Sequence, residues 1–325
     1  MNEGRVTPAR VATRPNVAEL AFASSRDAGE LANYLRQAHA AGITVDFRRA
    51  DRKLWGLALN YLVNHSFIEV ADAVAPHMVA AFPEVGYFRT MARLLERLPP
   101  PSEDSAFAAF RDDMTADVQV VPCAGANCVI LGFTGLAHRL GLPVDLIHRW
   151  FGTLGVHVIY LRDYAGHNYD QGIRALSPDM HGTLKALRQI IANLGVNRIV
   201  CYGNCLGGYG ALRYALELDA EAVLTFDGPT NLVRGFGNFT ILDRKAVEPG
   251  LDLRPLYQNA GYAPRAHLVY GGDNAFDCAQ AINFLGLPTV TLEMAPGWRT
   301  QDFFSGRYER LIRWLVDSSR TAGRP

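Results

Sequence analysis

The sequence predicts an α/β fold, in which a mostly parallel sheet with helices on both faces is preceded by an α-helical N-terminal region. From residue 106 onward, short apolar runs rich in β-branched residues alternate with amphipathic segments, a pattern typical of a parallel sheet covered on both faces. Between residues 17 and 98, apolar side chains recur only at helical spacing. A glycine-rich turn at residues 203–207 separates one apolar run from the amphipathic segment that follows it.

The composition also predicts how the chain divides. Residues 1–16 are polar and contain Arg and Pro, so we expect a flexible tail. Residues 17–98 resemble tetratricopeptide-type helical hairpins, with a plain helical bundle as the alternative. Residues 99–105 begin with three prolines and form the predicted linker. Residues 106–325 then form the predicted α/β domain.

The expected elements of that domain follow from the same patterns. Strands are predicted at residues 118–121, 128–133, 156–161, 198–202, 222–226, 266–270 and 289–292. Helices are predicted around residues 106–111, 141–154, 180–194, 206–218, 276–286 and 305–319. Residues 229–264 contain Gly and Pro breaks and little periodicity, so we expect them to form a small lid between two strands.

The turn at residues 203–207 reads Gly-Asn-Cys-Leu-Gly, with Cys205 at its centre. Gly-x-nucleophile-x-Gly between a strand and a helix is the nucleophile elbow, in which a strained backbone presents the central side chain. A thiol at a helix N-terminus is expected to favour its thiolate form, because the helix dipole and the free N–H groups stabilise negative charge. The alternative is a glycine-rich turn holding an inert cysteine.

With the elbow in place, the order of parts from about residue 115 to 320 resembles the α/β-hydrolase superfamily. That resemblance implies an oxyanion hole with one N–H from Leu206. The second N–H would come from the loop after an earlier strand, where Phe133 and Thr134 are the candidates.

Two narrower resemblances accompany this one. Residues 203–208 are similar to the Gly-x-Cys-x-Gly-Gly box of dienelactone hydrolases and polyhydroxyalkanoate synthases. Residues 160–163 and 227–231 are similar to segments of uncharacterised hydrolase-like proteins, some of them encoded beside polysaccharide-assembly genes.

The superfamily resemblance places a catalytic acid after one of the strands that follow the elbow. Asp277 is the first candidate and Asp273 the second, and Asp227 follows the preceding strand. Asn274 stands where the usual Gly-x-x-Asp pattern would put the acid. For Asp273 and Asp277, a helix-capping role is the alternative.

The expected base is missing. In the superfamily a histidine lies in the loop after the last strand, here residues 295–303, and no histidine follows His267. Three hypotheses stay open. In the first, His167 or His138 serves as the base. In the second, Cys205 acts as a thiolate without a base, which suits acyl transfer better than hydrolysis. In the third, the site is inactive and the fold binds a ligand or partner.

Composition limits the partners. The formal net charge is zero and no basic cluster is interleaved with aromatic residues, so nucleic acid is not expected. No apolar run approaches the ~20 residues needed to cross a bilayer.

The spacing of the five cysteines does not match a zinc site, so we expect no metal and no cofactor. Free cysteines and the lack of a signal-like apolar run predict a cytoplasmic location.

We therefore expect an acyl hydrolase or acyltransferase that uses Cys205 on an ester or thioester. Its substrate would be a small molecule or an acyl group on a carrier, and the N-terminal helices would offer a surface to a protein partner. The alternative function is that of a non-catalytic binding or accessory factor, in polysaccharide or envelope biosynthesis.

Overall fold

The computed structural model describes residues 27–232, 251–296 and 307–317. The chain divides into two compact units, residues 1–92 and 93–325. The predicted tail, the middle of the predicted lid and most of the loop that lacks the expected histidine lie outside the described residues.

The first unit is helical, as predicted. Its elements are α2 (Ala28–Ala40), the short 3-10 helix η1 (Phe47–Arg49), α3 (Arg52–Asn64), α4 (Ile68–Ala81) and α5 (Gly86–Glu96), across which the division falls. Asp27 and Asp51 cap α2 and α3 by accepting hydrogen bonds from backbone N–H groups two residues ahead. α4 ends at Ala81 and α5 begins at Gly86, with Pro83 in the turn between them. The likeness to tetratricopeptide hairpins stays a prediction.

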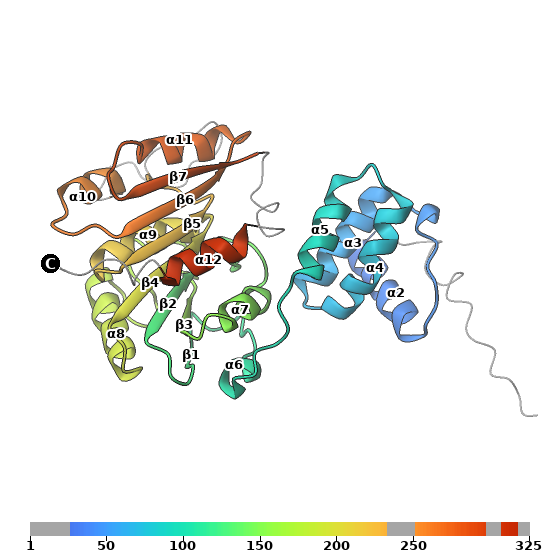
Figure 1. The fold of residues 1–325 in the computed structure, drawn as a ribbon, viewed down its shortest axis with the longest axis horizontal. Coiled ribbons are helices and arrows are strands. Elements are labelled where there is room, and N and C mark those ends of the chain that lie inside the picture. Colours follow the sequence, from blue (N-terminus) through green and yellow to red (C-terminus); the bar gives the residue numbers. More distant parts are fainter. Residues whose placement is uncertain (1–26, 233–250, 297–306, 318–325) are drawn as a thin grey trace, which may run out of the picture. The chain divides into compact units, whose positions relative to one another are not determined.

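The second unit contains a seven-stranded sheet, and this confirms the predicted fold class (Figure 1). The strands are β1 (Val118–Val121), β2 (Cys128–Phe133), β3 (His157–Leu161), β4 (Arg198–Asn204), β5 (Ala222–Phe226), β6 (Arg265–Gly271) and β7 (Val290–Ala295). Their order is β1-β3-β2-β4-β5-β6-β7. β1 pairs antiparallel with β3, and the other neighbours pair in parallel.

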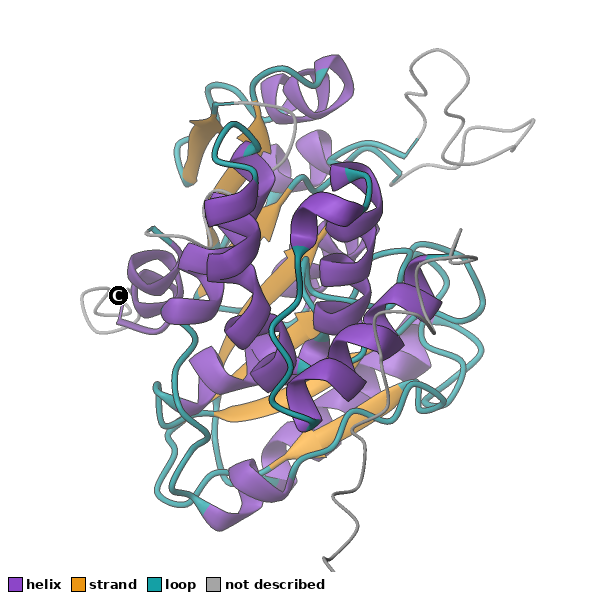
Figure 2. Cartoon of the chain, turned by 90° about the vertical axis from the view of Figure 1, so that its right-hand side faces the viewer, coloured by secondary structure: helices purple, strands orange, loops and turns teal. Residues whose placement is uncertain are grey.

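Helices cover both faces of this sheet, which appears as one twisted layer of strands in Figure 2. They are α6 (Ser105–Ala109), α7 (Val144–Gly152), α8 (Met180–Asn193), α9 (Leu206–Glu217), α10 (Leu253–Asn259), α11 (Ala275–Asn283) and α12 (Tyr308–Asp317). Successive side chains of a strand point to opposite faces. Tyr202 of β4 packs its ring against Phe151 of α7 and Tyr308 of α12. The preceding residue, Cys201, belongs to the opposite face.

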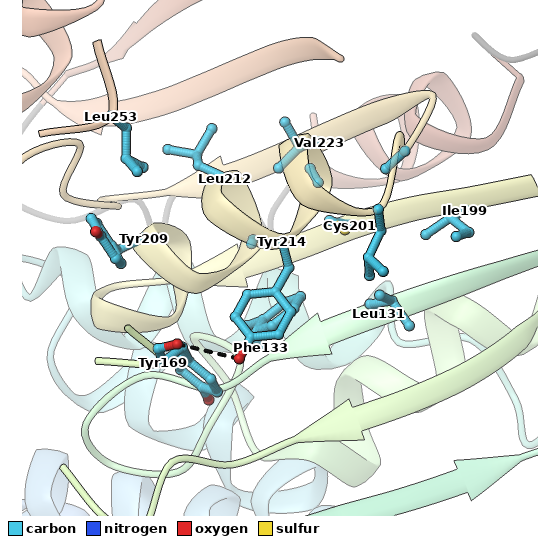
Figure 3. Close-up of a cluster of buried hydrophobic side chains, with 14 of the residues drawn as sticks. Leu131, Phe133, Tyr169, Ile199, Cys201, Tyr209, Leu212, Tyr214, Val223 and Leu253 are labelled. Atoms are coloured by element: carbon cyan, nitrogen blue, oxygen red, sulfur yellow. Dashed lines mark hydrogen bonds between the residues drawn. The ribbon is translucent and has the colours of Figure 1, made fainter. Parts of the chain in front are cut away.

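The core on that opposite face joins the strands to α8, α9 and α10 (Figure 3). Leu131, Cys201 and Val223 come from three neighbouring strands, and Leu212 from α9 packs against them. The hydroxyl of Tyr214 donates to the backbone carbonyl of Tyr169 across 3.2 Å, the bond drawn as a dashed line in Figure 3. Such packing fixes the start of α9 against the ends of the strands, where the glycine-rich turn lies.

The two described ends of the predicted lid are packed into the core of the unit, whereas a lid was expected to cover it. Residues 251–264 include α10, which the sequence analysis missed and whose start is marked by the capping side chain of Asp252. Leu253 and Tyr257 of α10 are buried in the core, and the Tyr257 hydroxyl donates to the Leu212 carbonyl. The described ends of this segment are therefore part of the packed unit.

Among the described residues, no helix is both long enough and apolar enough to cross a membrane.

A buried polar network ties the segment after β5 to α11. The side-chain oxygen of Gln280 accepts from the backbone N–H groups of Thr230 and Asn231 at 2.8 and 2.9 Å, and its amide donates to the Asn231 carbonyl at 3.0 Å. Asn283 adds bonds to the Thr230 hydroxyl and to Asp252. The network fixes α11 relative to the end of β5.

Replacing Gln280 with leucine is expected to lower the free energy of unfolding of this unit by about 3 kcal/mol. The variant removes three hydrogen bonds from buried backbone groups while keeping a similar volume, and each buried group that loses its partner costs about 1–3 kcal/mol. Urea unfolding followed by hydrogen exchange of β5 and β6 peptides measures the change. Gln189→Leu is the control, because Gln189 is exposed on α8 and its amide donates to Asn193 of the same helix. Equal stability of the two variants would contradict the prediction.

Candidate active site

The candidate site lies at the carboxyl ends of the central parallel strands. β2, β4, β5 and β6 are neighbours and run in the same direction, so the loops that follow them meet at one edge of the sheet. In open α/β sheets this edge is where ligands bind. The elbow follows β4, and the segments holding most of the other predicted site residues follow β2, β5 and β6.

Cys205 occupies a strained backbone position between β4 and α9. Its φ of 51° and ψ of −132° place a residue with a Cβ in a region that favours glycine. Two backbone hydrogen bonds of 2.8 Å hold this conformation: the Cys205 N–H donates to the Phe226 carbonyl, and the Gly208 N–H donates to the Cys205 carbonyl. The thiol is thereby presented at the N-terminus of α9, and the residue is exposed.

The glycines around Cys205 allow the backbone to approach closely. A Cβ on Gly207 would lie 2.1 Å from the Phe133 carbonyl oxygen, and one on Gly203 would lie 2.4 Å from the carbonyl oxygen of Gly207. Real Cβ atoms do not come so near to backbone atoms. The elbow predicted from the sequence is therefore present in its geometry, with α9 lying directly on β4 and β2.

Two backbone N–H groups, those of Leu206 and Leu136, lie close enough to the Cys205 thiol to lower its pKa. Leu206 is the donor predicted from the sequence. Leu136 takes the place of the other predicted donors: Thr134 already donates its N–H to the Leu161 carbonyl at 3.1 Å, and Phe133 lies within β2. Gly135 is the residue in the sequence that indicates this close approach, because a Cβ at position 135 would lie 3.0 Å from the Cβ of Cys205.

The electrostatics of the thiol differ from the sequence expectation. Although the residue as a whole is exposed, the pKa of Cys205 is raised above its ordinary value, chiefly because the protein atoms packed around its sulfur displace water there. The N–H groups of Leu206 and Leu136 lower the pKa, while the negative charges of Asp227 and Asp277 raise it further. The helix N-terminus alone therefore does not make Cys205 a thiolate at neutral pH.

Asp227 lies beside Cys205 on the neighbouring strand. Asn204 pairs with Phe226 in the β4–β5 register, so the next residue of each strand, Cys205 and Asp227, turns out of the sheet at the same level. Both have positive φ, 51° and 52°. The Asp227 N–H donates to the Val269 carbonyl, and one of its carboxyl oxygens accepts from the Gly271 N–H at 3.2 Å. These bonds fix its carboxyl group at the end of β6.

Asp277 completes the group from the first turn of α11. It is 7% exposed, and its carboxyl accepts from the Asn274 side-chain amide at 2.7 Å. The carboxyl of Asp227 lies near enough to act on its charge. Burial, followed by the negative charge of Asp227, raises the pKa of Asp277 to about 7. Asn274, where the superfamily pattern would put the acid, thus caps α11 and holds Asp277.

The other predicted residues do not join this group. Asp273 is exposed in the turn before α11. His167 lies in the loop after β3, and it is not among the described groups that shift the pKa of Cys205. His138 stacks on Tyr164 with ring centroids 4.2 Å apart, and burial lowers its pKa. Among the described residues, no cluster of three His, Cys, Asp or Glu side chains is arranged to hold a metal ion.

No family model and no curated protein matches the chain. Solved structures similar to it include MenH from S. aureus, at 12% identity over 63% of this chain and 99% of that one, with a TM-score of 0.45. A carboxylesterase structure from Nitrososphaera gargenis matches at 13% identity, 63% and 95% coverage and a TM-score of 0.44.

The capsule O-acetyltransferase of Neisseria meningitidis serogroup A matches at 12% identity over 66% of this chain and 99% of that one, with a TM-score of 0.43. At these identities and TM-scores, the likenesses carry no information on the activity of this chain.

Proposed function

We propose that the protein is an acyl hydrolase or acyltransferase that forms an acyl-thioester on Cys205 from an ester or thioester substrate. One observation carries the proposal: Cys205 is held at φ 51° at the start of α9, with the N–H groups of Leu206 and Leu136 near enough to its sulfur to lower its pKa. A strained cysteine between two convergent N–H donors is the arrangement that acyl transfer requires of a nucleophile and an oxyanion hole.

The chemistry follows from that geometry. The sulfur attacks the substrate carbonyl carbon, and the carbonyl oxygen becomes an oxyanion that accepts from Leu206 and Leu136. Collapse of this intermediate breaks the bond to the leaving alcohol or thiol, which departs with the proton that the Cys205 thiol has lost, and leaves the acyl group on Cys205. Water or an acceptor hydroxyl or thiol then attacks the acyl carbon, and its proton returns to the sulfur as the S–C bond breaks and the cysteine is released. Removing one oxyanion-hole donor typically costs about 10²–10³ in rate, so both N–H groups matter.

The test is acylation of Cys205 by model substrates. The full chain is mixed with p-nitrophenyl esters and acyl-CoA thioesters of increasing chain length, and adducts are located by peptide mass spectrometry. We expect an acyl adduct on Cys205 and a loss of turnover of at least about 10³-fold in Cys205→Ala. Cys123→Ala is the matched control, because Cys123 is a buried cysteine outside the site. Turnover that survives in Cys205→Ala would contradict the proposal.

A second candidate function is that of a non-catalytic binding or accessory factor. It is favoured by the raised pKa of Cys205 and by the lack of any histidine among the described groups that act on its thiol. This function predicts that the wild-type chain yields neither an adduct nor turnover with any member of the substrate panel. An adduct on Cys205 would exclude it.

A further inference from the structure

We infer that Tyr169, in the loop after β3, is a positioning residue that holds the turn after β2 against the nucleophile elbow. That turn, residues 134–136, carries the N–H of Leu136, which is the second donor of the proposed oxyanion hole. This role rests on the proposed function and names the side chain that keeps the donor in place. Tyr169 itself comes from a segment that the sequence patterns do not single out.

The hydroxyl of Tyr169 is buried at the base of the turn. Its oxygen lies 2.9 Å from the backbone carbonyl oxygens of both Thr134 and Leu161, and it shares its one proton between them. The Thr134 N–H donates to the same Leu161 carbonyl at 3.1 Å. Burial raises the pKa of Tyr169 above its ordinary value, so the hydroxyl keeps the proton that these carbonyls accept. The first residue of the turn is thereby fixed to the ends of β2 and β3.

The turn also packs against the elbow. A Cβ on Gly207 would lie 2.5 Å from the Thr134 carbonyl oxygen, the atom that also accepts from Tyr169. A Cβ on Gly135 would lie 3.0 Å from the Cβ of Cys205. The backbone of the turn is therefore in contact with both Tyr169 and the elbow. A shift of the Thr134 carbonyl would move the second oxyanion donor relative to the thiol.

Tyr169 is fixed to α9 as well, the helix that begins at the elbow (Figure 3). A Cβ on Gly210 would lie 2.7 Å from two atoms of the Tyr169 ring, so the ring lies directly against the backbone of the helix. The Tyr214 hydroxyl, one helical turn further along, donates to the Tyr169 backbone carbonyl at 3.2 Å. One side chain thus joins the helix that presents the nucleophile to the turn that carries the second donor.

The backbone at Tyr169 is strained, which is uncommon for a bulky residue. Asn168 and Tyr169 have consecutive positive φ values of 55° and 64°. The carboxyl group of Asp163 holds this conformation by accepting from the Tyr169 N–H at 2.9 Å and from the Gly166 N–H at 3.1 Å. Strained residues persist where their surroundings over-determine them, and they cluster at functional sites. Here the strained residue is the one whose hydroxyl reaches the turn.

Loss of this hydroxyl should slow attack on an ester more than it slows simple alkylation of the thiol. Attack on an ester carbonyl creates an oxyanion that needs both N–H donors, whereas iodoacetamide loses iodide from a saturated carbon and creates no oxyanion. Both reactions need the thiolate, so a change in the pKa of the thiol cancels in the ratio of their rates. A misplacement of about 1 Å can cost about 10²-fold in rate, so this ratio should fall by about 10–10²-fold in Tyr169→Phe.

The experiment measures both rates at Cys205 in the full chain at one pH. Acylation is followed as the burst of p-nitrophenol from the p-nitrophenyl ester that reacts fastest, and alkylation by mass spectrometry of the Cys205 peptide. Tyr257→Phe is the matched control, because the Tyr257 hydroxyl is also buried and donates to a backbone carbonyl of α9, that of Leu212, at 3.0 Å. It should leave the ratio unchanged.

Gly210→Ala is a second variant that decides the question if Tyr169→Phe does not fold. The added Cβ displaces the Tyr169 ring from α9 while the hydroxyl itself is kept. The ratio of acylation to alkylation should fall in this variant too, because the hydroxyl can no longer hold the Thr134 carbonyl in the same place.

The outcomes separate the two proposals. A lower ratio in Tyr169→Phe but not in Tyr257→Phe, with the acyl group on Cys205, supports both. A ratio that stays at the wild-type value in Tyr169→Phe, or falls equally in Tyr257→Phe, would overturn the positioning role and leave the proposed function standing. A wild-type chain that is not acylated at Cys205 by any ester or thioester of the panel, whether or not iodoacetamide alkylates it there, would overturn both.

Discussion

Asp277→Asn is expected to raise the free energy of unfolding at pH 8.5 by up to about 4 kcal/mol. The pKa of Asp277 is about 7 in the folded chain, against 3.8 for an ordinary aspartate. Below pH 3.8 the carboxyl is neutral in both states and costs nothing. Between pH 3.8 and 7 the unfolded chain releases the proton and the folded chain keeps it, so stability falls as pH rises. Above pH 7 the full cost, about 4 kcal/mol, persists.

Asparagine removes this cost without leaving an unsatisfied neighbour. Its side-chain oxygen accepts from Asn274 where Asp277 now does, and its neutral amide carries no charge to be repelled by Asp227. Urea unfolding followed by hydrogen exchange of β5 and β6 peptides, at pH 4 and pH 8.5, measures the difference. Asp219→Asn is the control, since Asp219 is exposed and its positive φ is tolerated by asparagine, and it should match wild type at both values. An Asp277→Asn variant that is no more stable at pH 8.5, or whose gain is the same at pH 4, would contradict the prediction.

Much of the fold could be predicted from the sequence because its signals are local. Runs such as 128–133 and 222–226 are mostly apolar and contain β-branched residues, and the observed β2 and β5 begin and end at the same residues. The glycines around Cys205 likewise mark an elbow wherever they occur between a strand and a helix. α10 was missed because Gly and Pro on either side of it break the periodicity, and its capping residue Asp252 was the only local sign.

The site was harder to predict from the sequence than the fold, because it depends on contacts between segments that are distant in the chain. Leu136 becomes a donor through the shape of the turn after β2, which its own side chain does not encode. The pKa of Cys205 is set by burial and by two carboxylates that follow other strands, and these outweigh the helix N-terminus that the sequence shows. Asp227 and Asp277 were both candidates, but only their spatial proximity makes them a pair rather than alternatives.

Gly207→Ala is expected to lower the free energy of unfolding of the second unit by about 3 kcal/mol or more. A Cβ at this position would lie 2.1 Å from the Phe133 carbonyl oxygen and 2.5 Å from that of Thr134. Both are backbone atoms of the segment at the end of β2, so no side chain can move aside, and overpacking of this kind costs about 1–3 kcal/mol or more. The overlap must also outweigh the gain of about 1 kcal/mol that alanine brings to a helix.

The sign of the effect therefore tests how closely α9 lies on β2. Relief of the overlap requires the start of α9 to move away from the sheet, which would carry Cys205 and the Leu206 N–H out of line with Leu136. Hydrogen exchange of β2 and β4 peptides across a urea series measures the loss. Gly261→Ala is the matched control, because a Cβ there meets nothing within 4 Å and the glycine is exposed. If Gly207→Ala were as stable as Gly261→Ala, the elbow could not have the close contact from which the strained Cys205 and its two N–H donors follow.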